Sequence, residues 1–223
     1  MSRFATLLAG CCLLAISLVA PAEEPAGAEV GKNLPGTFQP YNVNVAIPLT
    51  EEPEAEPKEK GAKATKYTSK DKFHCLVTEY DLDPVVMLVA SGLEDNAGFR
   101  DLLTKLDAAL DRNKLARLRC FVVFQDAALT DVTTQDDKRD EIVKKLDKLV
   151  LDAKLKNVVV TLAGKDDLAK YKLDPATALT AILYKNLRVE AMHKVGLDKL
   201  EAADGPEAKA ILADVGAKLG AKR

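Results

Sequence analysis

The chain has 223 residues, enough for one domain with a buried core plus additional segments. Its 32 Lys and Arg residues nearly balance its 34 Asp and Glu residues, so it lacks the basic surplus that nucleic-acid-binding proteins use. Only 5% of the residues are aromatic and Trp is absent, which argues against a carbohydrate-stacking surface.

The first 22 residues predict a secretory signal peptide. Arg3 precedes an uncharged apolar stretch from Phe4 to Val19, and small and acidic residues follow. Ala20 and Ala22 supply the small side chains that a signal peptidase requires, so we predict cleavage after Ala22 and export to the periplasm or the medium. The apolar stretch is shorter than the roughly 20 residues of a transmembrane helix, so no stable membrane span is expected after processing.

Lipid attachment is a second interpretation of the same segment. Residues 8–11 (LAGC) resemble a bacterial lipobox, in which Cys11 would be acylated and become the new N-terminus. The apolar run continues beyond Cys11, where lipoproteins usually become polar, so we favour cleavage after Ala22. That cleavage removes one base and no acid, which takes the net charge from −2 to −3.

Two further segments have biased composition. Residues 23–30 are rich in Ala, Glu, Pro and Gly and are predicted to be flexible. Residues 51–70 carry many charges and almost no apolar side chains, so they cannot bury enough surface to offset the entropy lost on ordering. We predict an exposed, solvated insertion here, inside one domain that spans residues 31–223.

From Phe73 onward, strand and helix patterns alternate, which predicts an α/β domain with helices covering a parallel or mixed sheet. The predicted strands are Phe73–Tyr80, Val85–Ala90, Leu118–Gln125, Val158–Leu162, Thr180–Tyr184 and Arg188–His193. Apolar residues at helical spacing predict helices over about 99–110 and 142–153, and a last helix that begins near Pro206.

This order of elements, with a tight turn between the last two strands, resembles the thioredoxin fold. Residues 29–44 (EVGKNLPGTFQPYNVN) are similar to the opening of the redoxin and alkyl hydroperoxide reductase/thiol-specific antioxidant families. Residues 83–106 are similar to the strand, loop and helix that carry the redox centre, and residues 179–193 to the closing hairpin. The resemblance implies a thioredoxin-like central mixed β-sheet flanked by helices.

The redox residues of these families have no counterparts at the matching positions. The resemblance places Leu93 and Asn96 where thioredoxins carry their two cysteines, and Leu179 where they carry a proline, usually cis. The loop SGLEDNAGF also lacks the cysteine that peroxiredoxins need. The usual thiol chemistry of the superfamily is therefore not expected at this loop.

Cys75 and Cys120 are the cysteines that remain after removal of the signal peptide. If both lie on neighbouring strands, the spacing of about 4.8 Å between strands would permit a disulfide. Three interpretations stay open: a displaced redox pair, a structural disulfide, or two buried free thiols. Burial in a strand raises the pKa of a thiol and blocks access, which argues against catalysis.

Metal and acid–base sites are not predicted. The soft or imidazole ligand candidates, His74, Cys75, Cys120 and His193, fit no compact metal motif, and a strand would place His74 and Cys75 on opposite faces. Two acidic pairs have structural interpretations, Asp81 and Asp83 as a turn before a strand and Asp166 and Asp167 as a helix start. No cofactor is implied.

The sequence favours an exported thioredoxin-fold protein without the redox motif, acting by binding or in a structural role in the cell envelope. An unidentified protein is the partner that this hypothesis allows. The alternative is a thiol-disulfide oxidoreductase or peroxiredoxin-related enzyme that uses Cys75 and Cys120.

Overall fold

The computed structural model describes residues 27–46, 68–126, 129–200 and 205–220. In these residues a mixed sheet has the strand order β2-β1-β5-β4-β3-β6-β7. The strands are β1 (Tyr41–Asn42), β2 (Lys72–Phe73), β3 (Val85–Ala90), β4 (Arg119–Gln125), β5 (Val158–Ala163), β6 (Leu179–Lys185) and β7 (Arg188–Val195). β3, β4 and β5 are parallel, while β1, β2, β6 and β7 pair antiparallel to their neighbours. The predicted α/β class with a mixed sheet is therefore confirmed.

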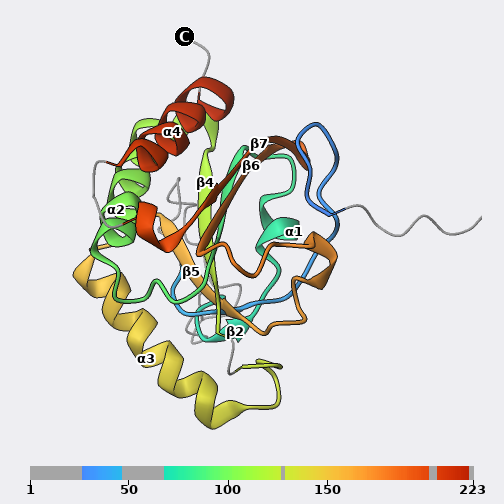
Figure 1. The fold of residues 1–223 in the computed structure, drawn as a ribbon, viewed down its shortest axis with the longest axis vertical. Helices are drawn as coiled ribbons and strands as arrows, with labels where there is room; N and C mark the ends of the chain where they lie inside the picture. Colours follow the sequence, from blue (N-terminus) through green and yellow to red (C-terminus); the bar gives the residue numbers. More distant parts are fainter. Residues whose placement is uncertain (1–26, 47–67, 127–128, 201–204, 221–223) are drawn as a thin grey trace, which may run out of the picture.

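Three long helices cover one face of the sheet (Figure 1). They are α2 (Ala97–Arg112), α3 (Asp136–Asp152) and α4 (Pro206–Asp214), the last continuing into a π-helical turn, Val215–Leu219. Their apolar stripes pack on the inward side chains of β3, β4 and β5 in one large core cluster. We call this side of the sheet the α2 face.

The opposite side, the α1 face, has thinner cover. The short helix α1 (Leu76–Tyr80), residues near Phe38 and the loop around Tyr171 pack there on a second core cluster. The central strands are buried on both sides. β3 therefore alternates between the two clusters: Val86 and Leu88 belong to the α2 face, and Val85, Met87 and Val89 to the α1 face. This explains why β3 is apolar throughout.

The predicted strand Phe73–Tyr80 is wrong. Only its first residue lies in a strand, β2, and Leu76–Tyr80 form helix α1. Cys75 is the N-cap of that helix, and Leu76, Val77 and Tyr80 are buried at helical spacing. A run of apolar and β-branched residues this short fits either structure, and packing on the α1 face selects the helix.

The other predicted elements are confirmed, with ends that differ by a few residues. The signal peptide, the lipobox with Cys11 and nearly all of the 51–70 insertion lie outside the described residues. Within the segment predicted to be flexible, the Ala28 amide donates to the Tyr171 carbonyl at 3.1 Å. In the part of the chain that the structure describes, no helix is long and apolar enough to cross a bilayer.

Candidate functional site

The loop after β3 is the position at which the resemblance places the redox centre. It runs from the carboxyl end of β3 to α2, and Gly92 takes a positive φ of 65° that suits glycine. The Asn96 amide donates to the Leu93 carbonyl at 3.1 Å, so the two positions close a tight turn. Asn96 also caps α2, because its Oδ1 accepts from the Phe99 amide at 2.8 Å.

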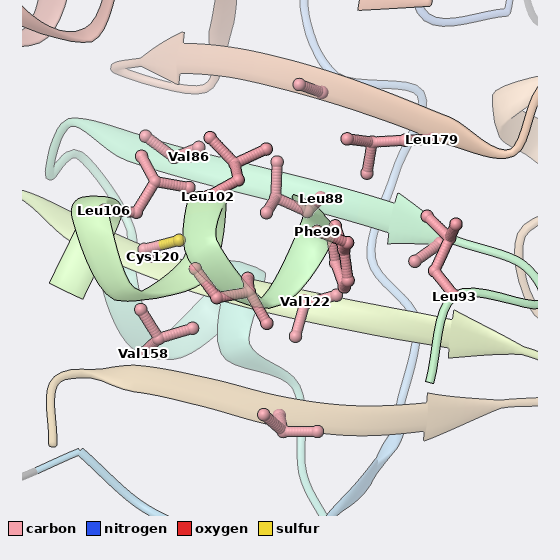
Figure 2. Close-up of a cluster of buried hydrophobic side chains, with 14 of the residues drawn as sticks. Val86, Leu88, Leu93, Phe99, Leu102, Leu106, Cys120, Val122, Val158 and Leu179 are labelled. Atoms are coloured by element: carbon pink, nitrogen blue, oxygen red, sulfur yellow. The ribbon is translucent and has the colours of Figure 1, made fainter. Parts of the chain in front are cut away.

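Leu93 and Leu179 fill this region with apolar side chains. Both are fully buried, and both belong to the core on the α2 face, together with Phe99 (Figure 2). Leu179 begins β6 and pairs with Ala90 at the end of β3. The predicted positions therefore do come together, but they form core packing and a helix cap, without a polar cleft between them.

Cys120 is inaccessible on the α2 face. It lies in β4 among Val86, Leu106 and Val158, beneath helix α2 (Figure 2), and it is 1% exposed. Burial raises the pKa of its thiol far above the usual value, and the carboxylate of Asp107 adds to that rise. Since the thiolate is the nucleophile, this side chain is unsuited to disulfide exchange.

Cys75 lies on the α1 face and is only partly buried. Its Sγ accepts from the Thr78 hydroxyl at 3.1 Å and from the Thr78 amide at 3.4 Å. The expectation that Cys75 and Cys120 occupy neighbouring strands is wrong, because Cys75 caps a helix and the sheet separates the two thiols. Both are free in the structure.

The remaining candidates have local structural partners. His74 contacts Glu79 at 2.7 Å and His193 contacts Asp214 at 3.0 Å. Asp83 accepts from Arg117 and Arg119 in the turn before β3, as predicted. Among the described residues, no group of three or more His, Cys, Asp or Glu side chains is arranged to hold a metal ion.

Asp166 and Asp167 lie in a turn that leads into a short 3₁₀ helix, Ala169–Tyr171. The Gly164 amide donates to Asp167 Oδ2 at 2.7 Å. Partial burial raises the pKa of Asp167, and the Gly164 hydrogen bond opposes that rise. The pair therefore shapes the loop between β5 and β6.

A cavity of about 340 Å³, which we call the Leu168 cavity, opens beside the carboxyl ends of β3 and β4. Its walls are apolar, with Val89, Leu168 and Leu173 among them, and they belong to the α1 face. Ser91, Gln125, Thr177 and Thr180 supply neutral polar groups, while Asp126, Lys165, Lys172 and Asp174 supply charges of both signs. Apolar walls with a few polar groups are typical of ligand sites.

A second cavity of about 260 Å³, the Ile142 cavity, adjoins the first. Ser91, Gln125 and Asp126 line both cavities, so they form a shared wall. The remaining lining includes Glu94 from the loop before α2, and Ile142 and Lys145 from α3. The two cavities together flank the loop at which redox activity would be expected.

These lining residues were not predicted from the sequence, although a signal was present. Ser91 directly follows the apolar run of β3, and Gln125 and Asp126 end that of β4. Parallel strands bring their carboxyl ends to one edge of the sheet, where open α/β folds bind ligands. Polar residues at these ends could therefore have been predicted to meet.

The described geometry matches known structures at low sequence identity. A putative protein disulfide isomerase from Bacteroides thetaiotaomicron is 12% identical with a TM-score of 0.52, covering 86% of this chain and 90% of that chain. A DsbF homologue from Corynebacterium diphtheriae is 10% identical with a TM-score of 0.50, and the match covers 89% of this chain and 96% of that chain. Peroxidoxin BcpB from Mycobacterium tuberculosis is 11% identical with a TM-score of 0.50, and the match covers 86% of this chain and 98% of that chain. No family model and no curated protein matches the sequence.

These likenesses show that the protein has the thioredoxin-like fold, as the sequence resemblance predicted. At 10–12% identity they show the fold alone. The activity depends on the residues at the site and not on the fold.

Proposed function

We propose that this protein is an exported thioredoxin-fold protein that acts by binding a partner and performs no thiol-disulfide chemistry. The observation that carries the proposal is the fully buried Leu93, at the place that the superfamily uses for its first redox cysteine. A leucine side chain there cannot form a thiolate, and Asn96 at the second place is engaged in capping α2.

The arrangement of the two remaining thiols supports the same conclusion. Cys120 is buried under α2, while Cys75 packs on the other side of the sheet. A dithiol enzyme has to close and open a disulfide between two sulfur atoms, which requires Cα atoms within about 7 Å and Cβ vectors that converge. Side chains on opposite faces of one sheet do not converge.

Export is the second part of the proposal and rests on the signal-like residues 1–22, with cleavage after Ala22. Intact mass of the mature protein tests it. A mass that corresponds to a chain starting at residue 23 supports the proposal. A mass that corresponds to a chain starting at an acylated Cys11 would show a lipid-anchored protein instead.

Assays of insulin reduction and peroxide consumption test the absence of thiol chemistry. We expect rates equal to those of a buffer blank, and the same rates for Cys75→Ser. Turnover by the native protein that disappears in Cys75→Ser would contradict the proposal.

A thiol enzyme remains the second candidate because of Cys75. Its side chain is only partly buried, and its Sγ accepts hydrogen bonds from the Thr78 hydroxyl and the Thr78 amide. In that case a single cysteine would act, without Cys120. Substitution Thr78→Val would then slow turnover in the same assays, while Cys120→Ala would leave it unchanged.

A further inference from the structure

Three leucine side chains are exposed at the amino ends of the parallel strands. Leu82 is 58% exposed in the loop before β3, and Leu115 is 99% exposed in the loop before β4. Leu151 is 74% exposed in the last turn of α3, which leads to β5. Because β3, β4 and β5 run parallel, all three leucines lie at the same end of the sheet.

Contacts between the loops join these leucines into one surface. The loop before β3 contacts the loop before β4 through Asp83 and Arg117, at 3.0 Å. The loop before β5 contacts the end of α2, because Asn157 Nδ2 donates to Asp111 Oδ1 at 3.2 Å. Asp111 also contacts Lys114 in the loop before β4, at 3.0 Å. The exposed leucines are therefore held close to one another on structured loops.

The turn between β6 and β7 completes this surface, because the Asn186 amide donates to the Leu82 carbonyl at 3.4 Å. We call the whole surface the leucine end, and it comprises residues 81–83, 111–118, 151–157 and 185–188. Seven Lys and Arg residues belong to it, three in 111–118, two in 151–157 and two in 185–188, against four Asp residues. The leucine end is thus both apolar and basic, although the whole chain has a net charge of −2.

The opposite end of the strands carries the opposite charge. The loops after β3 and β4, with the start of α3, contain six acids and no base: Glu94, Asp95, Asp126, Asp131, Asp136 and Asp137. This separation of charge orients the molecule in an electric field. An anionic surface attracts the leucine end and repels the acidic end, so the exposed leucines approach such a surface first.

Exposed leucines among Lys and Arg side chains fit the surface of a bilayer that contains anionic lipids. Aliphatic side chains are stabilised at the boundary between headgroups and acyl chains, while Lys and Arg are attracted to the lipid phosphates. An acidic protein would be attracted by the bases alone and would leave Leu115, at the exposed tip of its loop, without a function. The leucines therefore favour the lipid surface.

We propose that the leucine end binds peripherally to the surface of an anionic phospholipid bilayer, with Leu82, Leu115 and Leu151 among the headgroups and the neighbouring bases on the lipid phosphates. The inference goes beyond the proposed function, because it assigns a surface on which the protein is held. The Leu168 and Ile142 cavities lie at the acidic end and face away from the bilayer.

Sedimentation of the mature protein with vesicles tests the inference. The probe vesicles contain phosphatidylcholine with about a quarter phosphatidylglycerol, and the control vesicles contain phosphatidylcholine alone. We expect binding to the probe vesicles to be at least about tenfold tighter than to the control vesicles. The same affinity should fall by about tenfold or more between about 0.05 M and about 0.5 M salt, because salt screens the attraction.

Matched leucine variants locate the binding surface. Leu115→Ser should weaken binding to the probe vesicles by at least about threefold, because it removes an apolar side chain from the contact. Leu197→Ser is the control, since Leu197 is also exposed, at 54%, but follows β7 at the carboxyl ends of the parallel strands. That variant should bind like the native protein.

Matched lysine variants test the charge. The double substitution Lys154→Gln with Lys156→Gln keeps two long side chains but removes two positive charges from the leucine end, so binding should weaken by about fivefold or more. Lys165→Gln with Lys170→Gln removes two charges from the loop after β5, at the other end, and should leave the affinity unchanged.

A fluorescent reporter shows which end meets the lipid. The chain has no tryptophan, so Leu115→Trp introduces a single one at the leucine end. Its emission should shift to shorter wavelength on the probe vesicles, because the indole moves from water into the headgroup region. Leu197→Trp should show no shift.

Four results would overturn the inference. Two are the absence of binding to the probe vesicles and equal binding to the control vesicles. A third is binding that Leu115→Ser leaves unchanged, which would indicate an acidic protein as the partner. The fourth is salt-sensitive self-association without vesicles that Leu115→Ser abolishes, which would place the acidic end of a second copy on this surface.

The insulin and peroxide assays and the intact-mass measurement use no vesicles. Failure of the lipid surface therefore leaves the absence of thiol chemistry and the predicted export standing. Thiol turnover that requires Cys75 would contradict the proposed function and leave the lipid surface untouched.

Discussion

The two ends of the parallel strands differ in how their polar groups are satisfied. At the amino ends, Asp107 Oδ1 accepts from the amides of Lys156, Asn157 and Val158 at 2.7–3.0 Å, where β5 begins. Asp83 contacts Arg117 at 3.0 Å and Arg119 at 3.3 Å, at the start of β3 and β4. Carboxylates thus connect the loops at this end to the sheet.

At the carboxyl ends the same strands border two cavities, and Ser91, Gln125 and Thr180 have no side-chain hydrogen bond to a described residue. The loops at the first end are therefore held to the sheet by carboxylates, while the second end borders the two cavities. Removing a carboxylate at the first end should lower stability more than removing the side-chain polar group of Ser91, Gln125 or Thr180 at the second.

The largest effect is expected for Asp107→Ala. The substitution removes a carboxylate that accepts three backbone hydrogen bonds while 8% exposed, so the free energy of unfolding should fall by about 4 kcal/mol. Urea denaturation measures this loss. Asp198→Ala, which removes an exposed carboxylate paired with Lys199, is the control and should have little effect.

Leu93→Ala should lower the free energy of unfolding by about 3 kcal/mol, because it leaves a cavity beside Phe99 in the core. Leu93→Met keeps most of the volume and should lower it by less than about 1.5 kcal/mol. Equal, small losses for the two variants would mean that Leu93 is no core residue, and the position would again be a candidate for a functional site.

The smallest effects compare two buried threonines. The Thr161 hydroxyl donates to the Val122 carbonyl at 3.0 Å, so Thr161→Val should lower the free energy of unfolding by about 1 kcal/mol. Thr180→Val should change it by less than about 0.5 kcal/mol, since that hydroxyl has no described partner. A loss at Thr180 as large as that at Thr161 would show that its hydroxyl is bonded within the protein.

The central sheet and the long helices were predictable because their patterns are long and regular. The apolar stripe of α2 runs through 16 residues, and the apolar run of β3 is bounded by Pro84 and Gly92, which favours a strand over a helix. Residues 76–80 were mispredicted because five residues fit a strand or a helix equally, and contacts with residues far along the chain decide between them.

The site was only partly predictable for a related reason. The resemblance to the thioredoxin fold predicted that Leu93, Asn96 and Leu179 lie near one another. In the structure, Leu93 and Leu179 belong to the same core cluster on the α2 face. The pairing of Cys75 with Cys120 failed together with the strand on which it depended. The Leu168 cavity depends on how the loop at 165–177 packs over β3 and β4, which no local pattern in the sequence encodes.

Alkylation of the native protein by iodoacetamide at pH 8, followed by mass spectrometry, tests the central claim that the two thiols form no redox pair. Burial raises the pKa of Cys120, so its thiolate is scarce in the folded state and its sulfur is inaccessible. We predict at most one alkyl group, on Cys75, in the native protein with or without prior reduction, and two after unfolding. Two alkyl groups on the folded protein, or alkylation that appears only after reduction, would contradict the account.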